Sequence, residues 1–141
     1  MKLFSIIREV IEPTRDYQEV VSDIIDQGGE YKGSGDYGSV YLLNGKAVKV
    51  TTDEVELEHA ELLKGKNTKY FTHVFDVDIR NPKLGIITMD VLLPYSGEIS
   101  EDFIQRLKQE AEQIGIDPDE LDIRASNIMV NRQGHLKMID V

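Results

Sequence analysis

Three glycines, Gly33, Gly35 and Gly38, constrain the fold of this chain more than any other feature of its sequence. Glycine has no Cβ atom, so a turn with this spacing lets the backbone approach a bulky group and point N–H groups at phosphate oxygens. The segment that follows is not helical. Two β-prone runs flank Asn44-Gly45, a pair that predicts a tight hairpin turn. The glycines therefore lie between two strands of an antiparallel ribbon.

Length and charge restrict the class of protein. The chain has 141 residues, enough for one domain with a core, and no cysteine, so it has no thiol chemistry. Its formal net charge of −10 argues against nucleic acid or an anionic membrane as the main partner. No apolar run reaches the ~18 residues of a membrane span. Arg8 and Glu9 interrupt the first apolar patch, which makes a poor signal peptide. We therefore expect a cytoplasmic protein.

Two helices are expected before the glycines. The first runs from Leu3 to Ile11 and ends at Glu12-Pro13, because a residue before proline avoids the helical region. The second begins near Thr14 or Asp16 and stops at Gly28-Gly29. Its buried stripe is expected to contain four aliphatic residues: Val20, Val21, Ile24 and Ile25. We expect these helices to pack against the sheet, and docking of a partner is the alternative.

A further helix is expected at residues 54–64, after the second strand of the ribbon. Val55, Glu58 and Leu62 stand at i, i+3 and i+7, so they share one face. This places the carboxylate of Glu58 on a stripe predicted to be buried, where it needs a cation, and Lys49 is the obvious one. Two other glutamates remain as alternatives: Glu54 and Glu61.

Two strands and a helix follow. Residues 73–79 alternate with period two, and residues 84–93 form a longer apolar strand after a turn at Asn81-Pro82-Lys83. Ser100 is expected to cap a helix. The apolar stripe of that helix contains Phe103, Ile104, Leu107, Ala111 and Ile114.

The order of these segments, with a polar cluster near the end of the chain, resembles the protein kinase family. Gly33 to Val40 matches the pattern G-x-G-x-x-G-x-V, and Ala47-Val48-Lys49 matches the A-x-K of the third strand. Asp122 and Asn127 match the catalytic loop D-x-x-x-x-N, and Asp140 matches the aspartate of D-F-G.

The resemblance implies roles for individual residues. Asp122 would accept or orient the proton of an attacking hydroxyl, and Arg124 would steady the transferred phosphoryl group. Asn127 and Asp140 would share Mg²⁺ with the phosphates of ATP. The residues expected to bind the nucleotide are Gly33, Gly35, Gly38, Val40, Ala47, Lys49, Glu58, Met89, Asp90, Leu92 and Met129. Among them, Met89 would be the gatekeeper, and the main chain of Asp90 and Leu92 would bond the adenine edge.

By this resemblance the chain is one kinase-like α+β domain, residues 1–141. It would have an N-terminal helical extension (1–29), a nucleotide-binding small lobe with an antiparallel sheet and a helix (30–93), and a truncated large lobe with the catalytic loop (94–141). The function implied is transfer of the γ-phosphoryl group of Mg-ATP to a hydroxyl of a protein or small molecule. The alternatives are a pseudokinase-like module that binds a protein, with nucleotide as a structural ligand or none, and transfer of a nucleotidyl group.

Two departures from the family pattern favour the binding module. Glu120-Leu121-Asp122 stands in place of the H-R-D motif, without its histidine, and these 141 residues contain no A-P-E motif and no later large-lobe helices. We therefore expect the apolar surface of the 84–93 strand and the 103–114 helix to be covered by the N-terminal helices, a second copy or a protein partner.

Overall fold

The computed structural model describes residues 13–35 and 37–139. The helix predicted at Leu3–Ile11 lies outside these residues, as do Asp36, Asp140 and Val141. Among the residues described, no helix is both long and apolar enough to cross a membrane.

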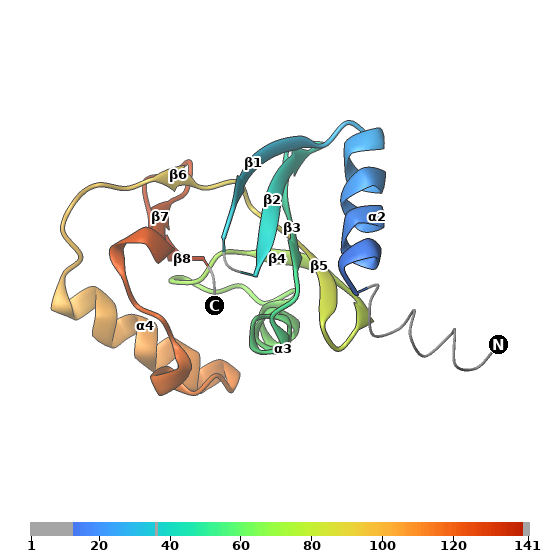
Figure 1. Cartoon of the computed structure of the whole chain (residues 1–141). Helices are drawn as coiled ribbons and strands as arrows, with labels where there is room; N and C mark the ends of the chain where they lie inside the picture. Colours follow the sequence, from blue (N-terminus) through green and yellow to red (C-terminus); the bar gives the residue numbers. More distant parts are fainter. Residues whose placement is uncertain (1–12, 36, 140–141) are drawn as a thin grey trace.

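Five antiparallel strands form the main sheet, in the order β1-β2-β3-β5-β4 (Figure 1). Their bounds are β1 Glu30–Ser34, β2 Gly38–Leu43, β3 Lys46–Thr51, β4 Val74–Asn81 and β5 Leu84–Met89. The turn between β2 and β3 is the one predicted, because Asn44 and Gly45 both have positive φ, 53° and 76°. An Asn-Gly pair adopts this conformation at low cost, which explains the hairpin.

The two faces of the sheet carry different residues. Paired residues on antiparallel strands point to the same face, so the pairs Val40–Lys49 and Ala47–Met89 place four of the expected nucleotide-binding residues together. The opposite face buries Tyr41, Val48, Val50 and Leu84 in a cluster with two residues of helix α2, Val20 and Ile24. Figure 1 shows α2 on one side of the sheet and the remaining helices beyond its other side.

Helix α2 spans Pro13–Asp26, so it begins slightly earlier than the predicted Thr14 or Asp16. Proline fits the first turn of a helix, where its missing N–H has no partner to lose. The helix ends before Gly28, whose φ is +103°, and the N–H of Gly29 returns to the carbonyl of Ile24 at 2.8 Å. The expected packing of α2 against the sheet is present in the structure, although Ile25 is exposed.

Helix α3 spans Glu54–Leu63 and begins as predicted, with the Asp53 side chain accepting a hydrogen bond from the N–H of Val55. Its buried face is not the predicted one. Val55 is 45% exposed and Leu62 is 37% exposed. The buried residues of α3 are Glu56, Leu57, His59, Ala60 and Leu63. The aliphatic residues of that face fill the core beside β4 and β5, and Leu57 lies so close to Gly85 that a Cβ there would be 2.3 Å from its Cδ2.

A smaller layer follows the main sheet. Strands β6 (Leu93–Pro94), β7 (Ile128–Val130) and β8 (Leu136–Met138) form a second antiparallel sheet, and α4 spans Glu101–Ile114. Helix α4 has the predicted cap, because the N–H of Phe103 donates to the Ser100 hydroxyl at 3.1 Å. The predicted 84–93 strand is instead divided into β5 and the short β6.

The apolar face of α4 is covered by this chain itself, which corrects the expectation that it needs other cover. Phe103, Leu107 and Ala111 are buried in one continuous core with Phe71 and with residues of β7 and β8. That core extends to Met89 and Leu57 of the main layer. The two layers therefore share one hydrophobic core.

Glu110 of α4 ties the helix to the segment before β4. Its carboxylate accepts hydrogen bonds from the backbone N–H groups of Lys69 and Tyr70, at 2.9 and 2.8 Å. We predict that Glu110→Ala lowers the free energy of unfolding by about 1–3 kcal/mol, because it removes two hydrogen bonds to a charged acceptor. Urea denaturation measures this. Glu112→Ala, on an exposed position of the same helix, is the control, and equal effects of the two changes would contradict the account.

Candidate functional site

The ion pair between Lys49 and Glu56 is the centre of the candidate site. Lys49 Nζ lies 2.6 Å from Glu56 Oε2, and only 12% and 10% of the two side chains are exposed. This corrects the predicted partner. Glu58 is exposed on the outer face of α3, and the alternatives Glu54 and Glu61 are exposed as well. The prediction was wrong because the buried stripe of α3 contains Glu56, His59 and Leu63, each one position after the residue that was expected to be buried.

A buried ion pair adds little stability by itself. The free energy needed to remove two charges from water offsets most of their mutual attraction. The second carboxylate oxygen, Glu56 Oε1, is buried and has no hydrogen-bond partner among the described residues. Glu56 lines a cavity of about 20 Å³ together with Thr72 and the expected gatekeeper Met89. The buried hydroxyl of Thr72 also lacks a partner among the described residues. The polar groups of this site are therefore not fully satisfied by the described fold, which points to a role other than stability.

The glycine turn connects β1 and β2 and is held at both ends. The N–H of Gly35 donates to the carbonyl of Gly38 at 2.9 Å. The carbonyl of Tyr37 accepts from both the N–H and the hydroxyl of Thr52, at 2.9 and 3.0 Å. The loop is thus anchored to Thr52, the residue that directly follows β3, the strand that carries Lys49.

The three glycines differ in whether the fold leaves room for a Cβ atom. A Cβ on Gly38 would lie 2.0 Å from the carbonyl oxygen of Val50, so the sheet itself requires glycine there. A Cβ on Gly33 or Gly35 would meet nothing within 4 Å. Packing inside the described chain therefore does not explain Gly33 and Gly35, whereas it fully explains Gly38.

The segment after β5 carries the main-chain groups of Asp90 and Leu92 that were expected to meet the adenine edge. The N–H of Asp90 donates to the carbonyl of His73 at 3.1 Å, so the carbonyl of Asp90 is the group left to meet a ligand. Leu92 is half-buried. Met129 lies on β7, in the second sheet, where it pairs with Pro94 and is half-buried.

The expected catalytic loop is held by Asn127. Its buried side chain donates from Nδ2 to the carbonyl of Asp122 at 2.9 Å, and its own carbonyl accepts from the N–H of Ile139 at the same distance. The carboxylate of Asp122 accepts from Arg124 Nε at 2.8 Å, and both side chains are more than half exposed. Asp140 follows Ile139 and lies outside the described residues. Within residues 13–35 and 37–139, no three His, Asp or Glu side chains are grouped to hold a metal ion.

His59 makes a contact that the sequence did not predict. It is buried on α3, and its Nε2 lies 2.8 Å from Glu120 Oε2. Glu120 occupies the place where the family pattern has the histidine of H-R-D. The contact therefore joins α3 to the segment that leads into the expected catalytic loop. The sequence signal for this burial is the helical spacing of His59 and Leu63, which places His59 on the same face as a buried leucine.

Lys137 lies on β8, in the second sheet. Burial lowers the pKa of its ammonium group, and the charges of Glu110 and Asp90 partly oppose that change. Lys137 Nζ donates to the carbonyl of Thr68 at 3.1 Å. This lysine therefore holds the segment before β4 against the second sheet.

The comparisons with known proteins bear on the fold. No protein-family model matches the chain, and no curated protein sequence matches it. Many solved structures do match. One is the protein kinase Rad53, residues 1–466, in complex with AMP-PNP, with a TM-score of 0.56 and 16% sequence identity. The match covers 79% of this chain but 36% of that one, so the chain spans about a third of the kinase structure's length. The chain therefore has a kinase-like fold, at an identity too low to carry activity with it.

We predict that the Lys49–Glu56 pair is coupled and that Glu58 is not part of it. Lys49→Met leaves a buried carboxylate without this cation and should lower the free energy of unfolding by about 3 kcal/mol or more. Lys49→Met/Glu56→Leu should recover at least half of that loss, because the charge is removed as well. Lys49→Met/Glu58→Leu is the matched control and should recover none. Recovery in the control, measured by urea denaturation, would show that Glu58 is the partner after all.

We predict that substitution by alanine destabilises the protein at Gly38 but not at Gly33 or Gly35. Gly38→Ala should lower the free energy of unfolding by about 1–3 kcal/mol, because its methyl group meets backbone. Gly33→Ala and Gly35→Ala should each stay within about 0.5 kcal/mol of the parent. Thermal unfolding followed by circular dichroism measures all three. A loss at Gly33 or Gly35 as large as that at Gly38 would refute the distinction.

Proposed function

We propose that this chain binds Mg-ATP on the sheet face opposite α2 and transfers the γ-phosphoryl group to a hydroxyl of a protein or small molecule. The observation that carries the proposal is the buried Lys49–Glu56 pair, on the same face as Val40, Ala47 and Met89. A lysine ammonium held by a helix glutamate is suited to grip nucleotide phosphates. The kinase-like fold, and a neighbour in the same fold that was solved with AMP-PNP, support the proposal.

The residues present fit a nucleotide. Val40, Ala47 and Met89 offer an apolar surface for the base, and the carbonyl of Asp90 is a hydrogen-bond acceptor at its edge. Gly33 and Gly35 have open space where other residues have a side chain, so phosphates would approach the backbone there. The amide oxygen of Asn127 and the carboxylate of Asp140 would hold Mg²⁺, since hard cations prefer oxygen donors. When bound, Mg²⁺ would neutralise charge on the phosphates.

Asp122 is the residue proposed to act on the accepting hydroxyl. Its main chain is fixed by Asn127, while its carboxylate is exposed and pairs with Arg124. The carboxylate can accept the hydroxyl proton through an oxygen while Arg124 keeps its orientation. Lys49 would orient the phosphates, and Arg124, which pairs with Asp122, would also counter charge on the transferred group.

The second candidate is a binding module that holds nucleotide without transferring phosphate. The specific observation in its favour is that Glu120, paired with His59, replaces the family's histidine. Nucleotide binding alone does not separate the candidates. Incubation with γ-labelled ATP does, and label in the α-position instead would reveal transfer of a nucleotidyl group.

We predict that Mg-ATP stabilises the chain by about 2.7 kcal/mol when its concentration is 100 times the dissociation constant. Differential scanning fluorimetry measures the shift. Gly33→Ala/Gly35→Ala should fold normally and reduce the shift, because the methyl groups obstruct the phosphates. No shift at millimolar Mg-ATP would exclude nucleotide binding by this chain.

The phosphotransfer assay uses γ-labelled ATP, candidate acceptors and Asp122→Asn as the matched variant. We expect the variant to keep the Mg-ATP shift and to lose transfer by at least 100-fold, as expected for loss of a proton acceptor. Equal transfer by Asp122→Asn would contradict the assigned role. A shift without transfer by the parent chain would favour the binding module.

A further inference from the structure

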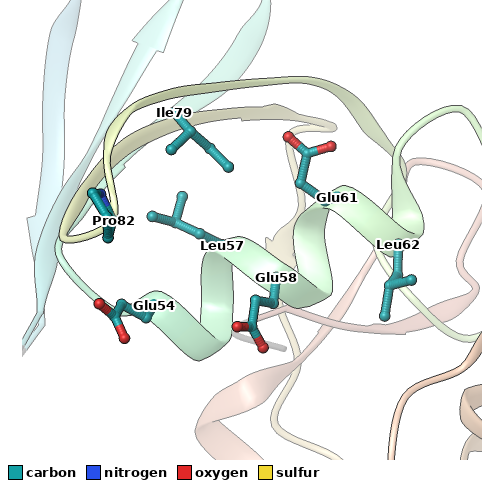
Figure 2. A pocket seen from close by; sticks show the side chains of 7 residues that line it. All are labelled: Glu54, Leu57, Glu58, Glu61, Leu62, Ile79 and Pro82. Atoms are coloured by element: carbon teal, nitrogen blue, oxygen red, sulfur yellow. The ribbon is translucent and has the colours of Figure 1, made fainter.

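A second feature, on the outer face of α3, is independent of the nucleotide site. Exposed residues of this face, the buried Leu57 beside them, Ile79 of β4 and Pro82 of the β4–β5 turn line an open groove of about 570 Å³ (Figure 2). Leu57, Ile79 and Pro82 form its apolar end, and their side chains lie near one another in Figure 2. Ile79 is 47% exposed and Leu62, farther along the helix, is 37% exposed. The groove therefore presents large aliphatic side chains to solvent.

Three carboxylates border this apolar surface. Glu54, Glu58 and Glu61 stand at i, i+4 and i+7 on α3, so helical spacing puts them on one face, and all three are exposed. None has an ion-pair partner among the described residues, whereas Asp78 of β4 pairs with Arg80 and Asp76 with Lys64. Glutamates four residues apart repel and weaken an isolated helix, so their grouping has a small local cost.

We propose that this groove binds a basic amphipathic segment of another protein. The occupant would place a large aliphatic side chain over Leu57, Ile79 and Pro82, with lysine or arginine on both sides to meet Glu54, Glu58 and Glu61. Charge complementarity selects this occupant. A neutral apolar segment would leave the three carboxylates unpaired at its edge, and an acidic one would be repelled.

The proposal does not depend on nucleotide binding. Lys49 and Glu56 face the opposite side of α3, so the groove can be altered without changing the proposed catalytic residues. A second copy of this chain is a poor occupant, because its net charge is −10.

The test uses a fluorescein-labelled synthetic peptide of alternating Lys-Lys-Leu-Leu blocks and measures fluorescence anisotropy with the full chain. Since an acidic protein attracts any cationic peptide, two triple variants with equal charge change are compared. The groove variant is Glu54→Gln/Glu58→Gln/Glu61→Gln. The control changes exposed glutamates elsewhere: Glu98→Gln/Glu101→Gln/Glu112→Gln.

We expect the groove variant to weaken peptide binding about tenfold, from three lost charge contacts, and the control to weaken it less than twofold. Ile79→Ser should also weaken binding at least fivefold, and amide resonances of Leu57 and Ile79 should shift on addition of peptide. Equal losses in the two triple variants, or no binding at 50 mM salt, would overturn the proposal. Self-association of the parent chain by light scattering that Ile79→Ser abolishes would overturn it too, in favour of a second copy.

Discussion

The alternation of side chains in the β2–β3–β5 ladder governs the rest of this structure. It divides the residues of one short ribbon between two environments, one covered by α2 and one facing the second layer. Tyr41, Val48 and Val50 pack in the environment covered by α2, so burial on this face stabilises the sheet without using any residue of the candidate site. Lys49 lies between Val48 and Val50 in sequence and therefore points the other way, to where Glu56 meets it. A slip of one residue in this register would exchange the two sets completely.

The shared hydrophobic core holds the two layers together. Phe71, Leu107 and Met138 come from distant segments and are all fully buried, in a cluster that also includes Leu57 and Met89. The hydrogen bonds of Glu110 and the contact between His59 and Glu120 join the same two layers at their edges. The candidate site thus lies where elements from both layers converge, as binding sites commonly do.

Local chemistry determined which parts could be predicted from the sequence. The Asn44-Gly45 hairpin, the Asp53 cap of α3 and the Ser100 cap of α4 follow from turn and cap preferences, and each is present in the structure. The face of α3 does not follow in this way. Val55 and Leu62 suggest one stripe, Leu57, Ala60 and Leu63 another, and a buried glutamate and histidine make the true stripe look polar.

The tertiary contacts were also beyond the reach of a single sequence. Coverage of α4 depends on Phe71, Ile128 and Met138, whose approach is set by the whole fold. The sequence alone therefore led us to expect cover from the N-terminal helices, a second copy or a partner. The contact of His59 with Glu120 joins residues 61 positions apart. The resemblance to protein kinase motifs made Lys49, Asn127 and Asp122 candidates, but only the structure shows which neighbours hold them.

The central claim is that the sheet face opposite α2 is built to receive a nucleotide. A titration of the ¹⁵N-labelled chain with Mg-AMP-PNP, followed by amide resonances, tests it most directly. The account predicts that the resonances that shift belong to the turn at Gly33 to Val40, to Lys49 and to the segment after Met89, while those of Val20 and Ile24 on α2 stay in place. Shifts confined to α2, or no shifts at millimolar nucleotide, would contradict it.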